Sequence, residues 1–595
     1  MENVALMENQ KTRRVRGSAI ITADGEAFFT PCRKSGAGGK HQRTSCFLSI
    51  FPRLTAGGSL FMAIFTPPFS SHGAKPEATL SKKTVTPYSI MKKTFKTFLA
   101  VIAAAILLLP ATAAAQAPLQ PKREFRGAWV QTVNGQYMGM HRDDMQRTLT
   151  SYLDAFKSYG LNAVMFQVRC EGDALYQSSY EPWSYYLTGQ QGKAPDPFWD
   201  PLQWIIDECH KRGLELHAWI NPYRAKTAAK HELALNHPIN MYPEHFFKYG
   251  DLTLFDPGEP YNREYICRVT ADILRRYDVD GIHMDDYFYP YPAAGRDIPD
   301  DKSYAQYNNG IADRADWRRH NVNELVRMMH DTIRAVKPWV KFGISPFGIY
   351  HNARRGGNVP GSATNGLENY EDLYADVLCW VNNGWVDYTM PQLYWQIGHP
   401  VADYATLINW WSENTRNRPL IIGESVENTI KYPDPQNPQS HQIYAKMNLA
   451  RSLGTAGTCQ WYAAAFAENR GNYAEALRQS YYSSPALPPA MPFISTQKPG
   501  KVKKLKPVWT EDGYMLFWSA PRAKKPIDEV QRYVVYRFAA GEPVNTEDAS
   551  HIVDITSNNF LLLPYADGSG RYTYAVTALN RIGNESKAKK KSVKL

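Results

Sequence analysis

The sequence is poor in cysteine, with 7 among 595 residues, and none of these stands in a spacing typical of a metal site. Beyond residue 115 the cysteines are Cys170, Cys209, Cys267, Cys379 and Cys459, an odd number of isolated residues that fall mostly within apolar strand or helix patterns. This arrangement predicts buried free thiols, and it argues against a disulfide framework or a zinc site. We expect no metal and no cofactor.

An excess of positive charge is also missing once the N-terminal segment is set aside. The whole chain has a formal net charge of +11, but residues 1–115 contain 15 Lys and Arg against 5 Asp and Glu, which leaves 53 basic and 52 acidic residues in the rest. A basic surface of the kind that binds DNA or RNA is therefore not indicated, and we expect no nucleic-acid partner.

An apolar run that ends at Leu109 is short for a membrane span of about 20 residues. It lies within residues 91–115, which begin with lysines and end with the small residues Ala113 and Ala115, a pattern typical of a bacterial secretory signal. We expect cleavage after Ala115, export to the periplasm or the cell exterior, and no stable membrane anchor afterwards; a retained anchor is the alternative. Because such a signal works only at an N-terminus, residues 1–90 are predicted to be a disordered, non-native upstream extension.

Residues 116–485 alternate short β-rich runs with longer helical patterns, which is typical of parallel βα units. The eight candidate strands lie at residues 126–133, 162–169, 214–223, 280–287, 341–349, 387–395, 419–425 and 457–464. Eight such units in this length predict an α/β fold, a (β/α)8 TIM barrel with loop insertions.

The pattern changes after a proline-rich linker at residues 486–500. Residues 501–595 show short runs of period-two alternation separated by turns, which predicts an all-β, immunoglobulin-like sandwich. The segment resembles a fibronectin type III domain, with Trp518 in an early strand and the run Tyr572, Tyr574 and Val576 in a late one. Such domains are more often spacers or docking units than catalysts.

Polar and aromatic residues gather at the predicted carboxyl ends of the barrel strands, where TIM barrels have their active sites. The candidates for catalysis are Asp285 and Asp286 after the fourth strand and Glu424 after the seventh. The candidates for substrate binding are Trp129, Arg169, Glu171, Asp173, Asn221, Tyr223, Arg224, Tyr289, Gln392, Tyr394, Trp395, Gln460 and Trp461. Cleavage of a glycosidic bond uses carboxyl groups as proton donor and as nucleophile, base or electrostatic stabiliser, while aromatic faces stack on sugar rings.

Asp285 and Asp286 are adjacent, so on an ideal strand their side chains point to opposite sides. We expect one to face the barrel axis and the other to face the rim or to cap a helix. Two buried like charges would raise the pKa of one carboxyl group, which suits a general acid. Our preferred partner is Glu424, and Glu171 and Asp173 are alternatives.

Structural roles are open for the same residues. Asp285 or Asp286 could cap a turn or pair with Arg224, and Glu424 could cap the helix that follows it. The Arg169 guanidinium could form an ion pair with Asp285 or Glu171 instead of binding a ligand. Five of the aromatic residues could singly be core filler, although five at predicted strand ends exceed what packing needs; they are Trp129, Tyr223, Tyr289, Trp395 and Trp461.

Several blocks occur in one order along the chain, among them FRGAWVQTV, GLELHAWINPYRA, DGIHMDDYFYPYP, FGISPFGIY and MPQLYW. In these blocks the chain resembles the glycosyl-hydrolase-like 10 family of secreted bacterial proteins, from residue 124 to about 480. The resemblance implies a (β/α)8 barrel acting on carbohydrate; some relatives are understood to cleave peptidoglycan strands that have lost their peptides.

The fourth strand is also similar to the signature of family 18 chitinases, but it differs at two positions. His283 stands where these enzymes have an inner aspartate, and Tyr287 stands at the position of their general-acid glutamate. The similarity therefore leaves substrate-assisted chemistry open, with Asp285 or Asp286 as the acid.

Taken together, the sequence predicts an exported bacterial glycoside hydrolase that acts on a cell-wall glycan or another glycan containing N-acetylhexosamine. One alternative is a carbohydrate-binding protein that keeps the barrel without catalysis. A metal-dependent glycan deacetylase is a further alternative, but the chain shows no His and Asp set for it.

Overall fold

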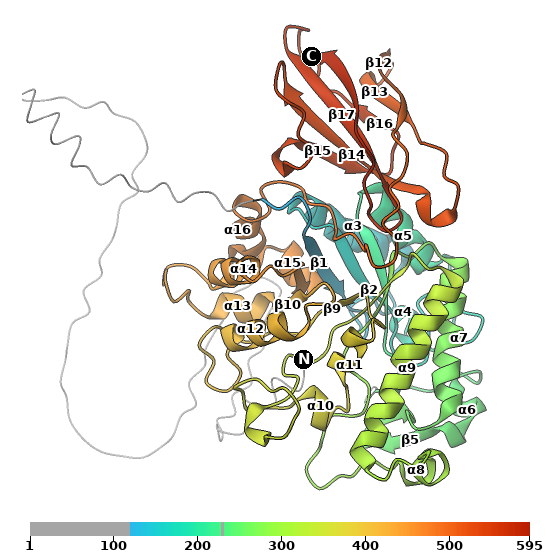
Figure 1. The fold of residues 1–595 in the computed structure, drawn as a ribbon. Helices are drawn as coiled ribbons and strands as arrows, with labels where there is room; N and C mark the ends of the chain where they lie inside the picture. The colour runs from blue at the N-terminus through green and yellow to red at the C-terminus, as the bar shows by residue number, and fades with distance from the viewer. Residues whose placement is uncertain (1–119, 228–230) are drawn as a thin grey trace, which may run out of the picture. The chain divides into compact units, whose positions relative to one another are not determined.

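The computed structural model describes residues 120–227 and 231–595 (Figure 1). The predicted signal at residues 91–115 and the predicted extension at residues 1–90 lie outside the described residues. Among the helices of the described part, none combines the length and the apolar character needed to cross a bilayer.

Eight parallel strands form the barrel and confirm the predicted (β/α)8 architecture. They are β1 (Phe125–Val130), β2 (Ala163–Arg169), β3 (Glu215–Ile220), β7 (Gly281–Met284), β8 (Lys341–Ile344), β9 (Tyr388–Thr389), β10 (Ile421–Ser425) and β11 (Gly457–Trp461). They pair in the order β10-β11-β1-β2-β3-β7-β8-β9. Single bridges from Thr389 to Leu420 and from Gln392 to Gly423 join the two ends, so the ring is nearly closed.

Helices and a small inserted sheet surround the barrel. The helices are α3 (Arg142–Ser158), α4 (Tyr185–Thr188), α5 (Pro201–Lys211), α6 (Pro238–Met241), α7 (Pro260–Arg276), α8 (Asp301–Tyr307), α9 (Arg314–Val336), α10 (Asn369–Asp372), α11 (Val377–Asn382), α12 (Tyr404–Asn414), α13 (Val426–Lys431), α14 (Ile443–Ser452), α15 (Ala463–Ala467) and α16 (Tyr473–Gln479). The inserted sheet consists of β4 (Arg224–Lys226), β5 (Phe246–Tyr249) and β6 (Leu252–Phe255), which the sequence did not predict.

Local sequence explains where these helices begin. In α5, for example, the Asp200 side chain accepts hydrogen bonds from the backbone N–H groups of Leu202 and Gln203, and Pro201 is the first helical residue. The capping aspartate and the proline together fix the start of α5. About one turn later, the buried Ile205 and Ile206 pack against the barrel.

Side-chain alternation divides the barrel into an interior and an outer layer. On β7, Ile282 and Met284 join the outer layer between strands and helices, whereas His283 points inward and accepts a hydrogen bond from Trp129 Nε1 at 3.1 Å. A Cβ on Gly281 would lie 2.3 Å from His217 Nδ1, so glycine is required at this inward position. The interior is therefore a packed core with polar groups at its centre.

The C-terminal segment forms two antiparallel sheets, which confirms its all-β character. Its strands are β12 (Lys503–Thr510), β13 (Gly513–Ser519), β14 (Val530–Ala539), β15 (Ile552–Thr556), β16 (Phe560–Leu562), β17 (Arg571–Asn580) and β18 (Lys589–Lys594). One sheet has the order β12-β13-β16 and the other β15-β14-β17-β18. Buried side chains including Leu516, Trp518, Val535 and Val576 form its core. The immunoglobulin-like class and the predicted domain boundaries stay predictions.

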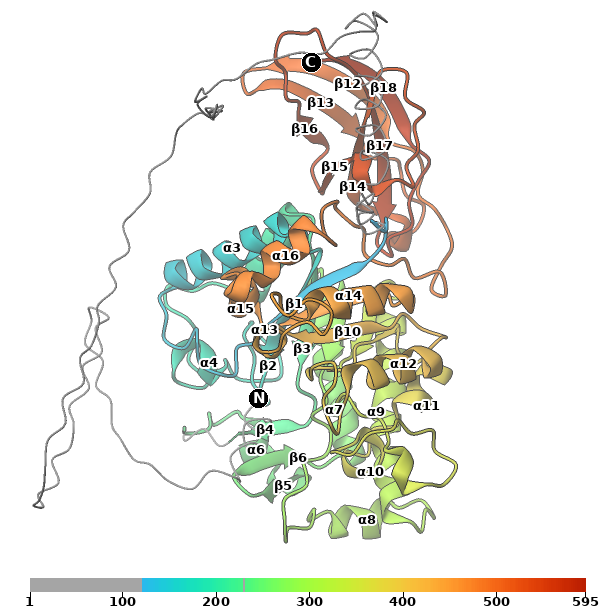
Figure 2. The same ribbon diagram turned by 90° about the vertical axis from the view of Figure 1, so that its left-hand side faces the viewer.

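The β12–β18 sheets and the β4–β6 insertion lie at opposite ends of the barrel in both views (Figures 1 and 2). The insertion follows the carboxyl end of β3, so it marks the end where the predicted site lies. The sheets cover the other end, at the first residues of the strands. We call the end with the insertion the mouth of the barrel and the opposite end its base.

At the base, Arg532 of β14 reaches two buried carboxylates of the barrel. Its guanidinium lies 3.4 Å from Glu215 Oε1 and 3.1 Å from Asp280 Oδ1. Lys341 Nζ lies 2.6 Å from Glu215, and His210 Nε2 lies 2.9 Å from Asp280. Glu215 and Asp280 therefore each have cationic or ionisable partners.

Candidate active site

Asp285 directly follows β7 and points toward the barrel axis. Its Oδ2 accepts a hydrogen bond from Trp219 Nε1 at 3.2 Å, and Trp219 belongs to the interior cluster. The side chain is nearly enclosed, since Asp285 is only 4% exposed. This carboxyl group is at the floor of the barrel mouth.

Asp286 is held at the rim by the loops that follow β7 and β9. The Tyr291 hydroxyl donates a hydrogen bond to its Oδ2, and Gln392 Nε2 donates one to its Oδ1 at 3.2 Å. The same amide nitrogen of Gln392 donates to the backbone oxygen of Ser345 at 3.0 Å, so the Gln392 side chain is fixed. Asp286 is 2% exposed and has donors on both oxygens.

Burial raises the pKa of both carboxyl groups. The pKa of Asp285 is well above its ordinary value because of burial first and the charge of Asp286 second, with Arg224 opposing the shift. Burial also raises the pKa of Asp286, while the hydrogen bonds from Tyr291 and Gln392 favour its ionised form. The environment therefore favours a proton on Asp285 and a negative charge on Asp286.

Aromatic rings surround the pair. Trp461 lies with its ring centre 6.2 Å from Trp129 and 6.2 Å from Trp219, and Tyr394 stacks on Trp461 at 6.5 Å. The Tyr394 hydroxyl is close enough to Asp285 and Asp286 for their charges to raise its pKa, in addition to the larger effect of burial. Trp129, Tyr394 and Trp461 were predicted at this place, and the structure brings them together.

Two further polar groups complete the mouth. The guanidinium of Arg224 lies 3.6 Å from the centre of the Tyr287 ring, a cation–π contact that orients the cation near the carboxyl pair. Within the described part of the chain, the buried Nε1 of Trp461 has no hydrogen-bond partner. An unsatisfied buried donor is costly, so a ligand atom that accepts from Trp461 would gain affinity there.

Glu424, the predicted partner of the pair, points away from the mouth. A Cβ on Gly423 would lie 3.0 Å from Trp129, so position 423 faces the interior and the next residue faces the helices. Glu424 accepts a hydrogen bond from the Tyr404 hydroxyl at 2.5 Å and lies 2.9 Å from Lys446 Nζ. The structure therefore does not bring Glu424 together with Asp285 and Asp286, and it gives Glu424 an ion-pairing position between β10, α12 and α14.

Arg169 also lies away from a ligand position. Its guanidinium forms a two-point ion pair with Glu181, with contacts of 2.6 to 3.0 Å, and donates to the backbone oxygens of Asn221 and Pro222. All these groups are buried. The residue connects the loop after β2 to the end of β3 and so has a supporting role. Its ion-pair partner is Glu181, and not Asp285 or Glu171 as the sequence suggested.

Glu171 and Asp173 lie in the loop after β2. Asp173 accepts hydrogen bonds from the backbone N–H of Tyr185 at 3.2 Å and from Gln191 Nε2 at 3.1 Å, which organises the loop. Glu171 accepts from the backbone N–H of Thr227 at 2.6 Å. Burial first, and the charge of Asp173 second, raise the pKa of Glu171 to about 7. The carboxyl group of Glu171 can therefore titrate near neutral pH.

Three predicted residues belong to the layer between the barrel and its helices. Tyr223 and Tyr289 are buried in the main apolar cluster. The Gln460 side chain donates to Thr458 and accepts from the Tyr473 hydroxyl at 2.7 Å, on the outer side of β11. These residues pack the scaffold, and none of these contacts faces the carboxyl pair.

Asn221 and Trp395 complete the predicted set. The backbone N–H of Asn221 donates to Arg169 O at 2.9 Å, so the buried Asn221 continues the pairing of β2 and β3 beyond their ends. Trp395 meets the Phe347 ring edge to face at 5.6 Å, and Phe347 meets Tyr291 in the same way at 6.3 Å. Trp395 therefore packs at the rim beside Tyr291, and these ring contacts do not include a carboxyl group.

The sequence-based prediction missed Trp219 and Tyr291, which contact the two carboxyl groups directly. Trp219 has the same parity as His217 in its strand, so an assignment of inward-facing positions could have identified it. Tyr291 lies in the loop after β7, where no periodicity fixes the direction of a side chain, and a sequence signal for it is absent.

Comparison with known proteins gives consistent matches. A family model described as "Glycosyl hydrolase-like 10" matches residues 124–441. The chain is 38% identical over 486 residues to "Glycosyl hydrolase YngK" of Bacillus subtilis (strain 168), which covers 80% of this chain and 94% of that protein. It is 38% identical over 291 residues to "Glycosyl hydrolase DigH" of Escherichia coli (strain K12), and this match covers 47% of this chain and 65% of that protein. A similar solved structure is the endo-beta-1,4-mannanase from Thermotoga petrophila, with a TM-score of 0.39, 12% identity, and coverage of 80% of this chain and 97% of that chain.

Proposed function

Because the chain belongs to the glycosyl hydrolase-like 10 family and is a glycosidase, we propose that it cleaves a glycan containing N-acetylhexosamine, from the cell wall or another source, at Asp285 and Asp286. Peptide-free peptidoglycan strands are among the candidate substrates. The observation that carries this proposal is the pair of adjacent buried carboxyl groups with raised pKa values below a wall of tryptophan rings.

The environments of the two carboxyl groups suggest separate roles. Asp285 donates its proton to the leaving glycosidic oxygen as the bond from that oxygen to the anomeric carbon breaks. Asp286, whose two donors favour its ionised form, stabilises the positive charge that develops on the sugar. A water molecule then adds to the anomeric carbon, and its released proton restores the acid form of Asp285.

The same proposal covers export and the C-terminal segment. The segment at residues 91–115 supports export to the periplasm or the cell exterior. Antiparallel sheets of three and four strands support a fibronectin type III-like domain at residues 501–595, after a linker at residues 486–500. In this proposal the barrel domain, residues 116–485, carries the chemistry.

The test compares residues 116–595 with the variants Asp285→Asn and Asp286→Asn. Substrates are peptide-free peptidoglycan strands and a panel of neutral glycans, and mass spectrometry measures the released products. We expect each variant to lose about 10²- to 10⁴-fold in rate, because proton transfer and charge stabilisation contribute on that order.

Asp301→Asn is the matched control, since the Asp301 side chain is 92% exposed on α8. It should leave the rate unchanged. Full cleavage by both mouth variants, with normal circular dichroism spectra, would contradict the assignment of the pair. Cleavage of neutral glycans without N-acetyl groups, and of no others, would contradict the substrate class.

A further inference from the structure

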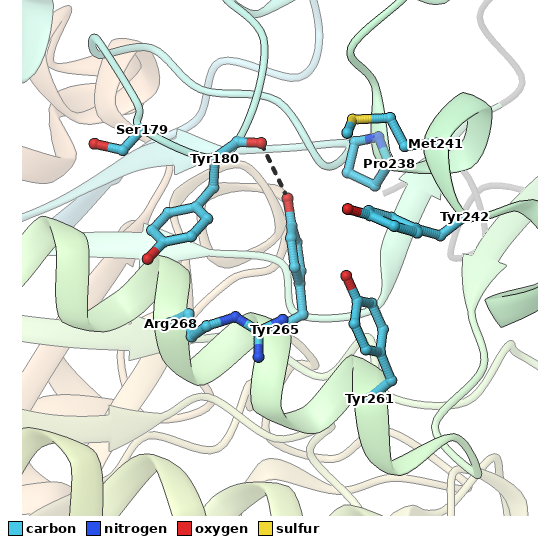
Figure 3. Close-up of a pocket in the computed structure, with 8 residues that line it drawn as sticks. All are labelled: Ser179, Tyr180, Pro238, Met241, Tyr242, Tyr261, Tyr265 and Arg268. Carbon is cyan, nitrogen blue, oxygen red and sulfur yellow. Dashed lines mark hydrogen bonds between the residues drawn. The ribbon is translucent and has the colours of Figure 1, made fainter.

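A second concave site lies on the outer side of the barrel, between α6, α7 and the loop after β2 (Figure 3). Its volume is about 280 Å³, and its walls include Tyr180, Tyr242, Tyr261, Tyr265 and Arg268. Ligand pockets in proteins range from about 300 to 1,000 Å³, so this tyrosine pocket is of the size for one ring of a ligand and not for a long chain.

Hydroxyl groups converge in the tyrosine pocket. Figure 3 shows the hydroxyl ends of Tyr242, Tyr261 and Tyr265 turned toward the same space. The Tyr261 hydroxyl interacts with Tyr242 and Arg268, and the Tyr265 hydroxyl donates to the backbone oxygen of Tyr180 at 3.3 Å. Phenol groups both donate and accept, so the pocket offers hydrogen bonds of both kinds to a ligand rich in hydroxyl groups.

Apolar surface borders these hydroxyl groups and remains open to solvent. Tyr180 is 38% exposed and Met241 is 51% exposed. The ring of Tyr261 is held in place because His245 stacks on it at 4.3 Å with an angle of 12° between the rings. A fixed aromatic wall with exposed apolar edges is the kind of surface on which a sugar ring packs.

The charge of the pocket favours a neutral ligand. The Arg268 guanidinium lies 5.3 Å from the centre of the Tyr261 ring and 5.7 Å from that of Tyr265, which orients it along the wall. Glu264 lies 3.8 Å from Arg268 and offsets its charge. The ion pair therefore reduces what an anionic ligand gains from Arg268, whereas sugar hydroxyl groups can accept a hydrogen bond from its guanidinium without carrying a net charge.

We propose that the tyrosine pocket is a second carbohydrate-binding site, which holds one neutral pyranose ring of a glycan chain away from the carboxyl pair. The proposal rests on the proposed function for the class of ligand. The pocket binds the chain while the mouth cleaves it, so each protein molecule has two independent sites for the glycan.

The binding experiment uses residues 116–595 with Asp286→Asn, so that the probe is not cleaved. The probe is the hexamer of N-acetylglucosamine, and isothermal calorimetry measures the affinity and the number of hexamers bound per chain. We expect two bound hexamers, and only one after Tyr180→Ala and Tyr242→Ala are added, or a loss of about three- to tenfold in the affinity of the second site. Tyr565→Ala, at an exposed tyrosine in the loop between β16 and β17, is the control and should change neither value.

A stoichiometry of one, or equal values with and without the pocket substitutions, would overturn the proposal, as would absence of binding to the hexamer. Arg268→Gln provides a second variant that keeps the aromatic wall, and it should weaken the second site alone. Neither Tyr180 nor the half-buried Tyr242 belongs to the buried core, and thermal unfolding verifies that each variant is folded.

A rate measurement separates failure of this proposal from failure of the proposed function. With an intact Asp286, the pocket variants should slow cleavage of long peptide-free strands and leave cleavage of short oligomers unchanged. If no glycan is cleaved but the pocket variants still lose one bound hexamer, the proposed function fails and the second site stands. If long and short substrates are cleaved as before by the pocket variants, and binding is unchanged, the second site fails and the proposed function stands.

Discussion

Both ends of the barrel contain a pair of buried carboxyl groups, but the pKa values of the two pairs are shifted in opposite directions. At the base, burial alone would raise the pKa of Glu215, but the charge of Lys341, with contributions from His217 and Arg532, lowers it to about 2. Asp280 behaves similarly, since Arg532 and His210 outweigh its burial and lower its pKa. At the mouth, Asp285 and Asp286 have raised pKa values, because burial outweighs Arg224 at Asp285 and outweighs the hydrogen bonds from Tyr291 and Gln392 at Asp286. Burial raises the pKa at both ends, and the balance between burial and the cationic or hydrogen-bonding partners decides the net direction.

The difference has opposite consequences for stability. The folded-state pKa of Glu215 is below the usual value of about 4.3, so Glu215 stabilises the fold above that pH and loses this contribution as the pH falls toward 2. The folded-state pKa of Asp285 is raised, so the native state retains a proton that the unfolded chain releases. Stability from this group therefore falls as the pH rises above about 4. The base stabilises the barrel, and the mouth is maintained at a cost in stability.

The largest effect is expected from removal of the shared cation at the base. Arg532→Met leaves Glu215 and Asp280 buried with fewer partners, and we expect the free energy of unfolding to fall by about 3–5 kcal/mol. Arg537→Met, on the same strand but exposed, is the control and should change it by less than about 0.5 kcal/mol. Urea denaturation followed by circular dichroism measures both, and equal unfolding midpoints for the two variants would show that the base network contributes little.

Glu424→Gln should have a smaller effect on stability and little on catalysis. The substitution leaves Lys446 buried beside a neutral amide, and we expect a loss of about 2 kcal/mol in the free energy of unfolding. Its rate of glycan cleavage at 25 °C should stay within about twofold of the parent chain, because the ion pair is in the helical layer. A loss of rate as large as that of Asp285→Asn would return Glu424 to the catalytic set.

Asp285→Asn tests the pH dependence of stability at the mouth, which should have the opposite sign from that at the base. The amide keeps the size of the side chain and removes the proton release, so the stability of the variant relative to the parent should increase as the pH rises from 4 to 8. Thermal unfolding at several pH values measures this trend. A difference that stays constant with pH would mean that Asp285 titrates alike in the folded and unfolded states, which would sink the contrast between the two ends.

The smallest effect is expected for Tyr291→Phe. This change removes a donor that favours the ionised form of Asp286, so the pKa of Asp286 should rise. Since the proposed mechanism needs an ionised Asp286, the acidic limb of the pH profile of kcat/KM should move to higher pH, while the basic limb, assigned to Asp285, should stay in place. Movement of the basic limb alone would exchange the roles of the two residues.

Much of the barrel could be predicted from the sequence, because eight β-rich runs separated by helical patterns specify eight units without knowledge of contacts. The carboxyl pair could be located for the same reason, since it follows a strand directly. The direction of Glu424 was missed because β10 is buried on both faces, so hydrophobicity does not show which side chains face inward. Gln460 was missed in the same way on β11.

The base network could not be predicted by any local rule. Glu215, Asp280 and Lys341 stand at the beginnings of three strands, and Arg532 comes from a segment whose pairing with them spans about 250 to 320 positions of the chain. Charged residues at the start of a strand are ordinarily exposed, and the sequence alone does not show that another sheet covers them. The prediction of an all-β C-terminal segment was therefore correct, but it did not indicate that Arg532 of this segment contacts the barrel.

The contact of Arg532 with the barrel has a consequence for engineering. A spacer domain can usually be cut off or exchanged as a cassette, but removal of β14 would uncover Glu215 and Asp280 and take away a cation that they share. A minimal version of the enzyme would therefore need either β14 grafted with the barrel, or apolar replacements at both carboxylates and at Lys341 together. The predicted linker separates the two segments in the sequence. The ion pairs of the buried barrel carboxylates nevertheless include Arg532, which lies beyond that linker.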